Sequence, residues 1–95
     1  PGDEVIDWSL TSRDVFNFVR ALSHPGPLAH TKFNGNLVRI VKVQLIYDAP
    51  KYKCIPGALL AKDDGGFLVK TGDSYVRIVD WISDVKLFAG GRFSL

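Results

Sequence analysis

One segment of the chain, residues 11–22, has the period of an amphipathic helix, and it limits the folds that are possible. Its apolar residues recur three or four positions apart and therefore share one side of a helix; they are Val15, Phe18, Val19 and Leu22. Thr11 suits the N-cap position, and the two prolines and one glycine at 25–27 end the helix. Because a helix of about 12 residues is marginal alone in water, its apolar side must pack against the rest of the chain.

The remainder of the chain has the pattern of short antiparallel strands. Asn34-Gly35, between two apolar segments, is typical of a type I′ hairpin turn and predicts strands at 29–33 and 37–47. The apolar alternation of the second strand changes phase at Ile40-Val41, which indicates a bulge or a strong bend. We expect further strands at 58–61, 67–71 and 75–82, and the apolar residues of 85–88 are suited to extend the sheet.

This pattern predicts a mainly β fold: a small open antiparallel β-barrel of five or six strands, like an oligonucleotide-binding barrel. The N-terminal helix at 11–22 packs on it and covers an open end, and the barrel with its tail occupies 29–95. Trp8 is large and apolar, so we expect it to be buried near the start of the helix. Phe33 and Tyr47 also suit the core.

The length of 95 residues, 46% of them hydrophobic, indicates a single domain. The chain begins with Pro1 and contains no methionine, which we interpret as a fragment of a longer chain with residues 1–7 as the end of a linker. Its one cysteine allows no internal disulfide and suits a reducing compartment. No signal peptide and no apolar run of about 20 residues is present, so we expect no membrane partner.

The net charge is only +2, but residues 15–53 carry six basic residues against one acidic residue. Such an excess can be an ordinary solvated surface or the footprint of a polyanion such as a nucleic acid. The candidate nucleic-acid contacts are Lys32, Arg39, Lys42, Lys51 and Lys53. Aromatic residues among such cations can stack on single-stranded bases, and Tyr52 joins Phe33 and Tyr47 as a candidate.

The sequence offers no catalytic residues and no metal site. His24 follows the helix, where a histidine interacts with the helix dipole or solvent, and His30 lies on a predicted strand. Cys54 has two lysines nearby, but no base is placed beside it by the sequence. Residues 63–66 have the composition of a turn and lack the oxygen ligands of a calcium loop. Arg20 suits an interaction with carbonyls at the helix end.

Several short motifs, taken in order, resemble the C-terminal domain of the methionyl-tRNA formyltransferase family. They are Ile6-Asp7-Trp8, Arg20-Ala21-Leu22, Pro25-Gly26, Asn34-Gly35, Pro56-Gly57 and Thr71-Gly72-Asp73. The set covers almost the whole chain. One departure is a longer exit from the helix, where Pro27-Leu28 separates Gly26 from Ala29.

The resemblance implies a non-catalytic accessory domain that positions the substrate of a formyltransferase, with tRNA as a partner in protein biosynthesis. An N-terminal Rossmann-like catalytic domain in the same chain would bind 10-formyltetrahydrofolate and use Asn, His and Asp to move the formyl group onto an amine. No cofactor is implied for this domain itself, and the family's location is the cytoplasm.

Other functions remain open from the sequence. The same appended domain occurs in relatives that formylate nucleotide-linked amino sugars and in formyltetrahydrofolate hydrolases and dehydrogenases. The mild basic charge of this chain, compared with the strongly basic tRNA enzymes, keeps the amino-sugar alternative open. An independent small-barrel nucleic-acid module and a purely structural or dimerisation domain are the alternatives from other classes.

Overall fold

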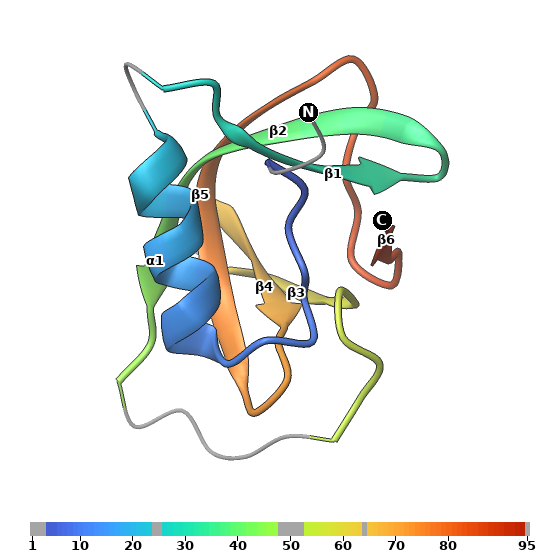
Figure 1. The fold of residues 1–95 in the computed structure, drawn as a ribbon. Coiled ribbons are helices and arrows are strands. Elements are labelled where there is room, and N and C mark those ends of the chain that lie inside the picture. The colour runs from blue at the N-terminus through green and yellow to red at the C-terminus, as the bar shows by residue number, and fades with distance from the viewer. Residues whose placement is uncertain (1–3, 24–25, 48–52, 64, 95) are drawn as a thin grey trace.

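The structure is a computed structural model that describes residues 4–23, 26–47, 53–63 and 65–94. Its elements are α1 (Ser12–Leu22), β1 (Ala29–Phe33), β2 (Asn36–Leu45), β3 (Leu59–Asp63), β4 (Gly66–Lys70), β5 (Tyr75–Ser83) and β6 (Phe93–Ser94). The strands form one curled antiparallel sheet in the order β3-β4-β5-β2-β1-β6, and α1 lies beside β2 and β5 (Figure 1). The predicted mainly β barrel with one N-terminal helix is therefore confirmed.

The two outer strands of the sheet meet each other, so the sheet curls round a core. Ala58, just before β3, forms an antiparallel bridge with Arg92, just before β6. The Leu59 N–H donates to the carbonyl of Gly91 (2.9 Å). Side chains that point into this curl form one continuous core of aliphatic and aromatic residues.

Helix α1 begins as its sequence predicts. Thr11 has an extended backbone, and its Oγ1 accepts a hydrogen bond from the Asp14 N–H (3.2 Å). Val15 and Val19 are buried, while Phe18 and Leu22 are partly buried against the core. The apolar side of the helix faces the sheet, chiefly β2, which supplies the partner that a short helix needs.

The turn between β4 and β5 holds the start of α1. The Ser12 N–H donates to Asp73 Oδ1 (2.9 Å), and the Ser12 and Thr71 hydroxyls are hydrogen-bonded at 2.7 Å. The Gly72 N–H donates to the Leu10 carbonyl (2.8 Å). The hydrogen bond from the Ser12 N–H, the largest effect, lowers the pKa of Asp73. The Thr71-Gly72-Asp73 motif therefore joins the sheet to the helix.

Strand β2 contains the predicted irregularity. Its register with β5 shifts between Ile40 and Lys42, and again between Lys42 and Val43. Val38 and Ile40 point into the core before the shift, and Val43 is buried after it. A period-two strand can change its buried parity only through such an extra residue, so the bulge is confirmed.

Two predictions about apolar residues are wrong. Tyr47 is 79% exposed, because β2 ends at Leu45 and Tyr47 lies beyond the sheet. Residues 85–88 do not extend the sheet as a strand. The Val85 N–H donates to Ser83 Oγ (3.1 Å), which turns the chain away at the end of β5. Leu87 is nevertheless buried, and the sixth strand is β6 in the tail.

Trp8 is buried as predicted, and its partners come from distant parts of the chain. Its ring stacks on Phe93 with centroids 5.4 Å apart, and its indole N–H donates to Thr31 Oγ1 (3.1 Å). Just before it, the Ile6 N–H donates to the His30 carbonyl (2.9 Å). The N-terminal segment and β6 thus both pack against β1.

Candidate nucleic-acid interface

The five candidate cations lie on different parts of the fold. Lys32 is on β1, and Arg39 and Lys42 are on β2. Lys53 is exposed in the segment before β3. Lys51 lies outside the described residues, as does the candidate stacking residue Tyr52.

Lys32 and Arg39 share the outer face of the β1-β2 hairpin. Both side chains are exposed, whereas Thr31 and Phe33 on β1 point inward and are buried. In the register of the pair, Lys32 lies opposite Leu37, so Arg39 is its diagonal neighbour on the same face. Such neighbours are about 7–8 Å apart, so the two positive charges can contact one extended ligand.

Apolar side chains accompany these two cations. Leu37 is 44% exposed, and Ile82, which lies opposite Arg39 on β5, is 54% exposed. We call the exposed set Lys32, Leu37, Arg39 and Ile82 the hairpin face. It mixes charge with apolar contact area on rigid strands, which suits a ligand that has both phosphate and apolar groups.

Lys42 is separated from the hairpin face by the bulge in β2. It lies opposite Asp80 of β5 in the register, and it lines a cavity of about 320 Å³ between α1 and the sheet. Arg20 of α1 lines the same cavity; its guanidinium lies over the Phe16 ring, 5.5 Å from the centroid. Sequence reasoning did not find this grouping, because the pairing of Lys42 with Asp80 is a long-range register.

The two candidate stacking residues that the structure describes differ in how far their rings are buried. Phe33 is 1% exposed and packs edge-on against Phe88 and Phe93, with centroids 5.0 and 5.8 Å apart, so its ring is part of the core. Tyr47 was predicted for the core, but its exposure leaves its ring accessible to a base.

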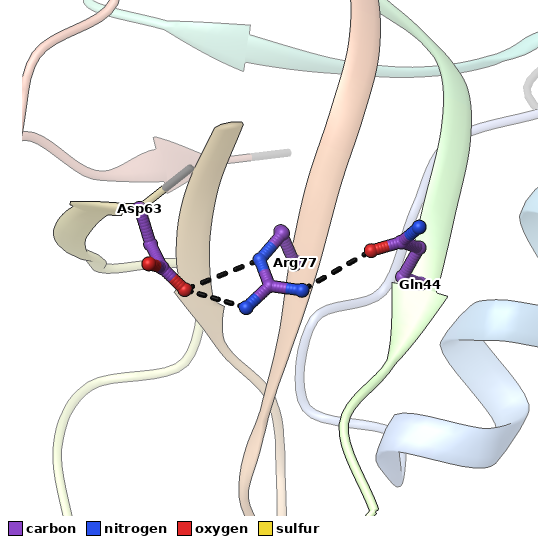
Figure 2. A network of polar contacts seen from close by, with 3 residues as sticks. All are labelled: Gln44, Asp63 and Arg77. Carbon is purple, nitrogen blue, oxygen red and sulfur yellow. Dashed lines mark hydrogen bonds and ion pairs between the residues drawn. The ribbon is translucent and has the colours of Figure 1, made fainter. Parts of the chain in front are cut away.

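Asp63, the last residue of β3, takes part in a structural network. Asp63 Oδ2 accepts hydrogen bonds from Arg77 Nε (3.2 Å) and Nη2 (2.5 Å), and Arg77 Nη1 donates to Gln44 Oε1 (3.1 Å) (Figure 2). This network joins β3, β5 and β2 across the outside of the sheet. The described residues contain no group of three or more His, Cys, Asp or Glu that could hold a metal ion.

The histidines and the cysteine have ordinary surroundings where the structure describes them. His30 is half-buried on β1, where its backbone pairs with Arg39 and with the N-terminal segment. Cys54 is exposed. His24 lies outside the described residues. Within the described part of the chain, no helix has the length and apolar character that crossing a bilayer requires.

A small curled antiparallel barrel, with a helix anchored to it by the Thr71-Gly72-Asp73 turn, defines the class of domain. The model of the family described as "Formyl transferase, C-terminal domain" matches residues 1–86. The chain belongs to this family.

The curated relatives include longer formyltransferases. The chain is 37% identical over 78 residues to the methionyl-tRNA formyltransferase of Streptococcus agalactiae serotype III, a match that covers 82% of this chain and 24% of that protein. It is 35% identical over 79 residues to the enzyme of the same name from Mycoplasma mycoides, which covers 82% and 25%. The chain thus spans about a quarter of the length of these relatives.

Among solved structures, the chain is similar to a variant of HypX from Aquifex aeolicus. The TM-score is 0.69 and the identity 25%, over 86% of this chain and 14% of that one.

Proposed function

We propose that this chain is the accessory domain of a formyltransferase and positions the substrate that accepts the formyl group. The observation that carries the proposal is the match to methionyl-tRNA formyltransferases over most of this chain but only about a quarter of theirs. The chemistry then belongs to a catalytic domain in the same protein, which binds 10-formyltetrahydrofolate and transfers the formyl group to an amine. The acceptor is methionyl-tRNA, and the location is the cytoplasm.

The hairpin face is the part of this domain that we propose contacts the tRNA. Lys32 and Arg39 are exposed on neighbouring strands, so they bind backbone phosphates without reorganising the chain. Leu37 and Ile82 beside them contact sugars or unstacked bases. Phosphate contacts fix the orientation of an RNA without reading its sequence, which is the role of a positioning domain.

The test is binding of an initiator tRNA to the 95-residue chain at several salt concentrations. Each phosphate contact releases bound counterions, so the affinity falls as salt rises. Lys32→Gln and Arg39→Gln should each weaken binding and reduce the salt slope by about one. Lys62→Gln, which removes an exposed cation from β3, is the matched control and should leave the slope unchanged.

A second acceptor, a nucleotide-linked amino sugar, is favoured by the net charge of only +2. For that acceptor, the isolated chain has no salt-dependent affinity for tRNA. The tRNA proposal is therefore contradicted if the affinity for tRNA does not change with salt at low ionic strength. It is also contradicted if Arg39→Gln and Lys62→Gln change that affinity equally.

A further inference from the structure

The cavity between α1 and the bulge of β2 combines an apolar wall with charged side chains at its mouth. It has a volume of about 320 Å³. Its lining residues belong to α1, β2 and β5 and to Ser23 after α1, and these three elements lie side by side in Figure 1. The apolar lining is Phe16, Val19, Val41 and Val43, and the polar lining is Arg20, Ser23, Lys42 and Asp80. This volume is at the lower end of the range for small-molecule sites. We call this cavity the helix cleft.

The Arg20 guanidinium is held at the cleft. It lies over the Phe16 ring at 5.5 Å, and Nη2 donates to Asn17 Oδ1 (3.3 Å) on the same helix. A guanidinium has five N–H donors, so most of them are left for a ligand. The stacking and the hydrogen bond limit its rotamers, which lowers the entropy cost of binding an anion.

The other two charges of the helix cleft are also available. Lys42 and Asp80 lie opposite each other in the β2-β5 register, at the shift between Ile40 and Val43. Within the described residues, neither side chain takes part in an ion pair, in contrast to Arg77, which pairs with Asp63. Lys42 therefore offers a second cation, and Asp80 offers a hydrogen-bond acceptor.

These features together describe the ligand. The apolar wall is suited to contact a flat, apolar group, and Arg20 and Lys42 are suited to bind an anion. The Asp80 carboxylate can accept a hydrogen bond from an amino group. We propose that the helix cleft binds a nucleotide whose base carries an exocyclic amine, with the base against Phe16 and Val41 and the phosphate on Arg20 and Lys42. Adenine and cytosine carry such an amine, and uracil has none.

This proposal does not rest on the proposed function of the hairpin face. A free mononucleotide, an unstacked base of an RNA and a nucleotide-linked sugar share the same chemistry, so the test must separate these sources. The first arm titrates the 95-residue chain with AMP, CMP, UMP, adenosine and inorganic phosphate, and follows backbone amide shifts by NMR. The second arm titrates a short single-stranded RNA and a nucleotide-linked sugar.

The expected result is a set of shifts confined to the helix cleft, in residues 16–23, 41–43 and 80. AMP and CMP should bind more tightly than phosphate by about tenfold, the worth of the apolar contact, and more tightly than adenosine by a larger factor, because adenosine loses the charge-assisted contacts with both Arg20 and Lys42. UMP should bind several-fold more weakly than CMP, because uracil has a carbonyl oxygen in place of the cytosine amine that donates to Asp80. The affinities of the single-stranded RNA and of the nucleotide-linked sugar are then compared with that of AMP. The ligand that binds most tightly identifies the source of the nucleotide.

Variants make the assignment specific. Arg20→Gln and Lys42→Gln should each weaken AMP binding by about tenfold, and Asp80→Asn should reduce the preference for CMP over UMP. Lys62→Gln removes a cation outside the cleft and should change nothing. Val41→Phe, which fills the cleft with an apolar side chain, should abolish binding while amide spectra show that the fold is kept.

The proposal is overturned if AMP binds no better than phosphate, or if the shifts map to the hairpin face instead. It also fails if Lys62→Gln weakens binding as much as Lys42→Gln. Salt-dependent tRNA binding on the hairpin face without mononucleotide binding would remove this inference and leave the proposed function intact.

Discussion

Gly72 shows how a single residue can determine the contact between the sheet and α1. A Cβ added at Gly72 would lie 2.1 Å from the Ser9 carbonyl oxygen and 3.0 Å from the Leu10 carbonyl oxygen. Both obstacles are backbone atoms, so a side-chain rotation cannot relieve the clash. The Thr71-Gly72-Asp73 motif therefore requires glycine at its centre, because the backbone of Ser9 and Leu10 approaches it too closely for a Cβ.

Gly72→Ala is expected to lower the free energy of unfolding by about 1–3 kcal/mol, because the added methyl group forces the two backbones apart. Urea denaturation followed by tryptophan fluorescence measures the change. Gly35→Asn is the matched control: Gly35 has a φ of +81° and open space around it, and asparagine tolerates that conformation. Equal losses at the two glycines would show that contact with Ser9 is not the cause.

At the scale of the element, α1 is stabilised at its start by the β4-β5 turn as well as by its own N-cap. Asp73 supplies an acceptor for the Ser12 N–H from a distant part of the chain, and its negative charge lies near the positive end of the helix dipole. Asp7 is a second carboxyl whose pKa is lowered, chiefly by a hydrogen bond from the Ser9 hydroxyl. These carboxyls make part of the stability depend on pH.

The pKa of Asp73 is lower in the folded state than in the unfolded state. Its contribution to stability is therefore complete above the ordinary aspartate pKa of about 4 and is lost as the pH falls through the lowered folded-state value. Asp73→Ala should cost about 0.5–1 kcal/mol at pH 7, near the low end for a cap because the side chain is exposed.

The measurement for Asp73 is the free energy of unfolding of wild type and Asp73→Ala between pH 7 and pH 2. The difference should shrink in the acid range. Asp84→Ala, at an exposed position after β5, is the control and should show a small difference at every pH. A difference for Asp73→Ala that stays constant down to pH 2 would contradict a role for its charge.

At the scale of the whole molecule, the barrel depends on contacts between the two ends of the chain. Phe93 of β6 is 1% exposed, stacks on Trp8 and packs edge-on against Phe33. The bridge between Ala58 and Arg92 lies beside it. Loss of the Phe93 ring therefore affects the N-terminal segment, β1 and the closure of the sheet together.

Phe93→Ala is expected to cost about 3–5 kcal/mol, a large share of the stability of a domain this size. Phe88→Ala is the matched control: Phe88 also packs against Phe33 but is 52% exposed, so its loss should cost much less. Denaturation measures both, and hydrogen exchange at the Leu59 amide, which bonds to Gly91, reports closure directly. Unchanged protection of Leu59 in a folded Phe93→Ala chain would show that β6 does not hold the barrel closed.

The elements that local chemistry specifies could be predicted from the sequence. Asn34 and Gly35 both have positive φ, at 52° and 81°, as the hairpin turn between β1 and β2 requires. The phase change at Ile40-Val41 predicted the bulge because each side chain alternates faces. The position of Tyr47 could not be predicted, because alternation does not reveal where the last pairing of a strand ends.

Part of the candidate site could likewise be predicted from the sequence, and part could not. That Lys32 and Arg39 point outward follows from the burial of their neighbours on β1 and β2, which the apolar alternation shows. That Lys42 lies opposite Asp80 and lines a cavity with Arg20 depends on the β2-β5 register and on the packing of α1. Long-range pairing of this kind has no local signal.

The sequence by itself determined the helix, its N-cap, the hairpin and the bulge, because each depends on the period or backbone preference of adjacent residues. Only the tertiary structure decided that Trp8 stacks on Phe93, that the sheet closes beside Ala58, and that Lys42 lines the helix cleft. The physical reason is that these contacts join residues far apart in the chain, where packing of the whole core selects the register.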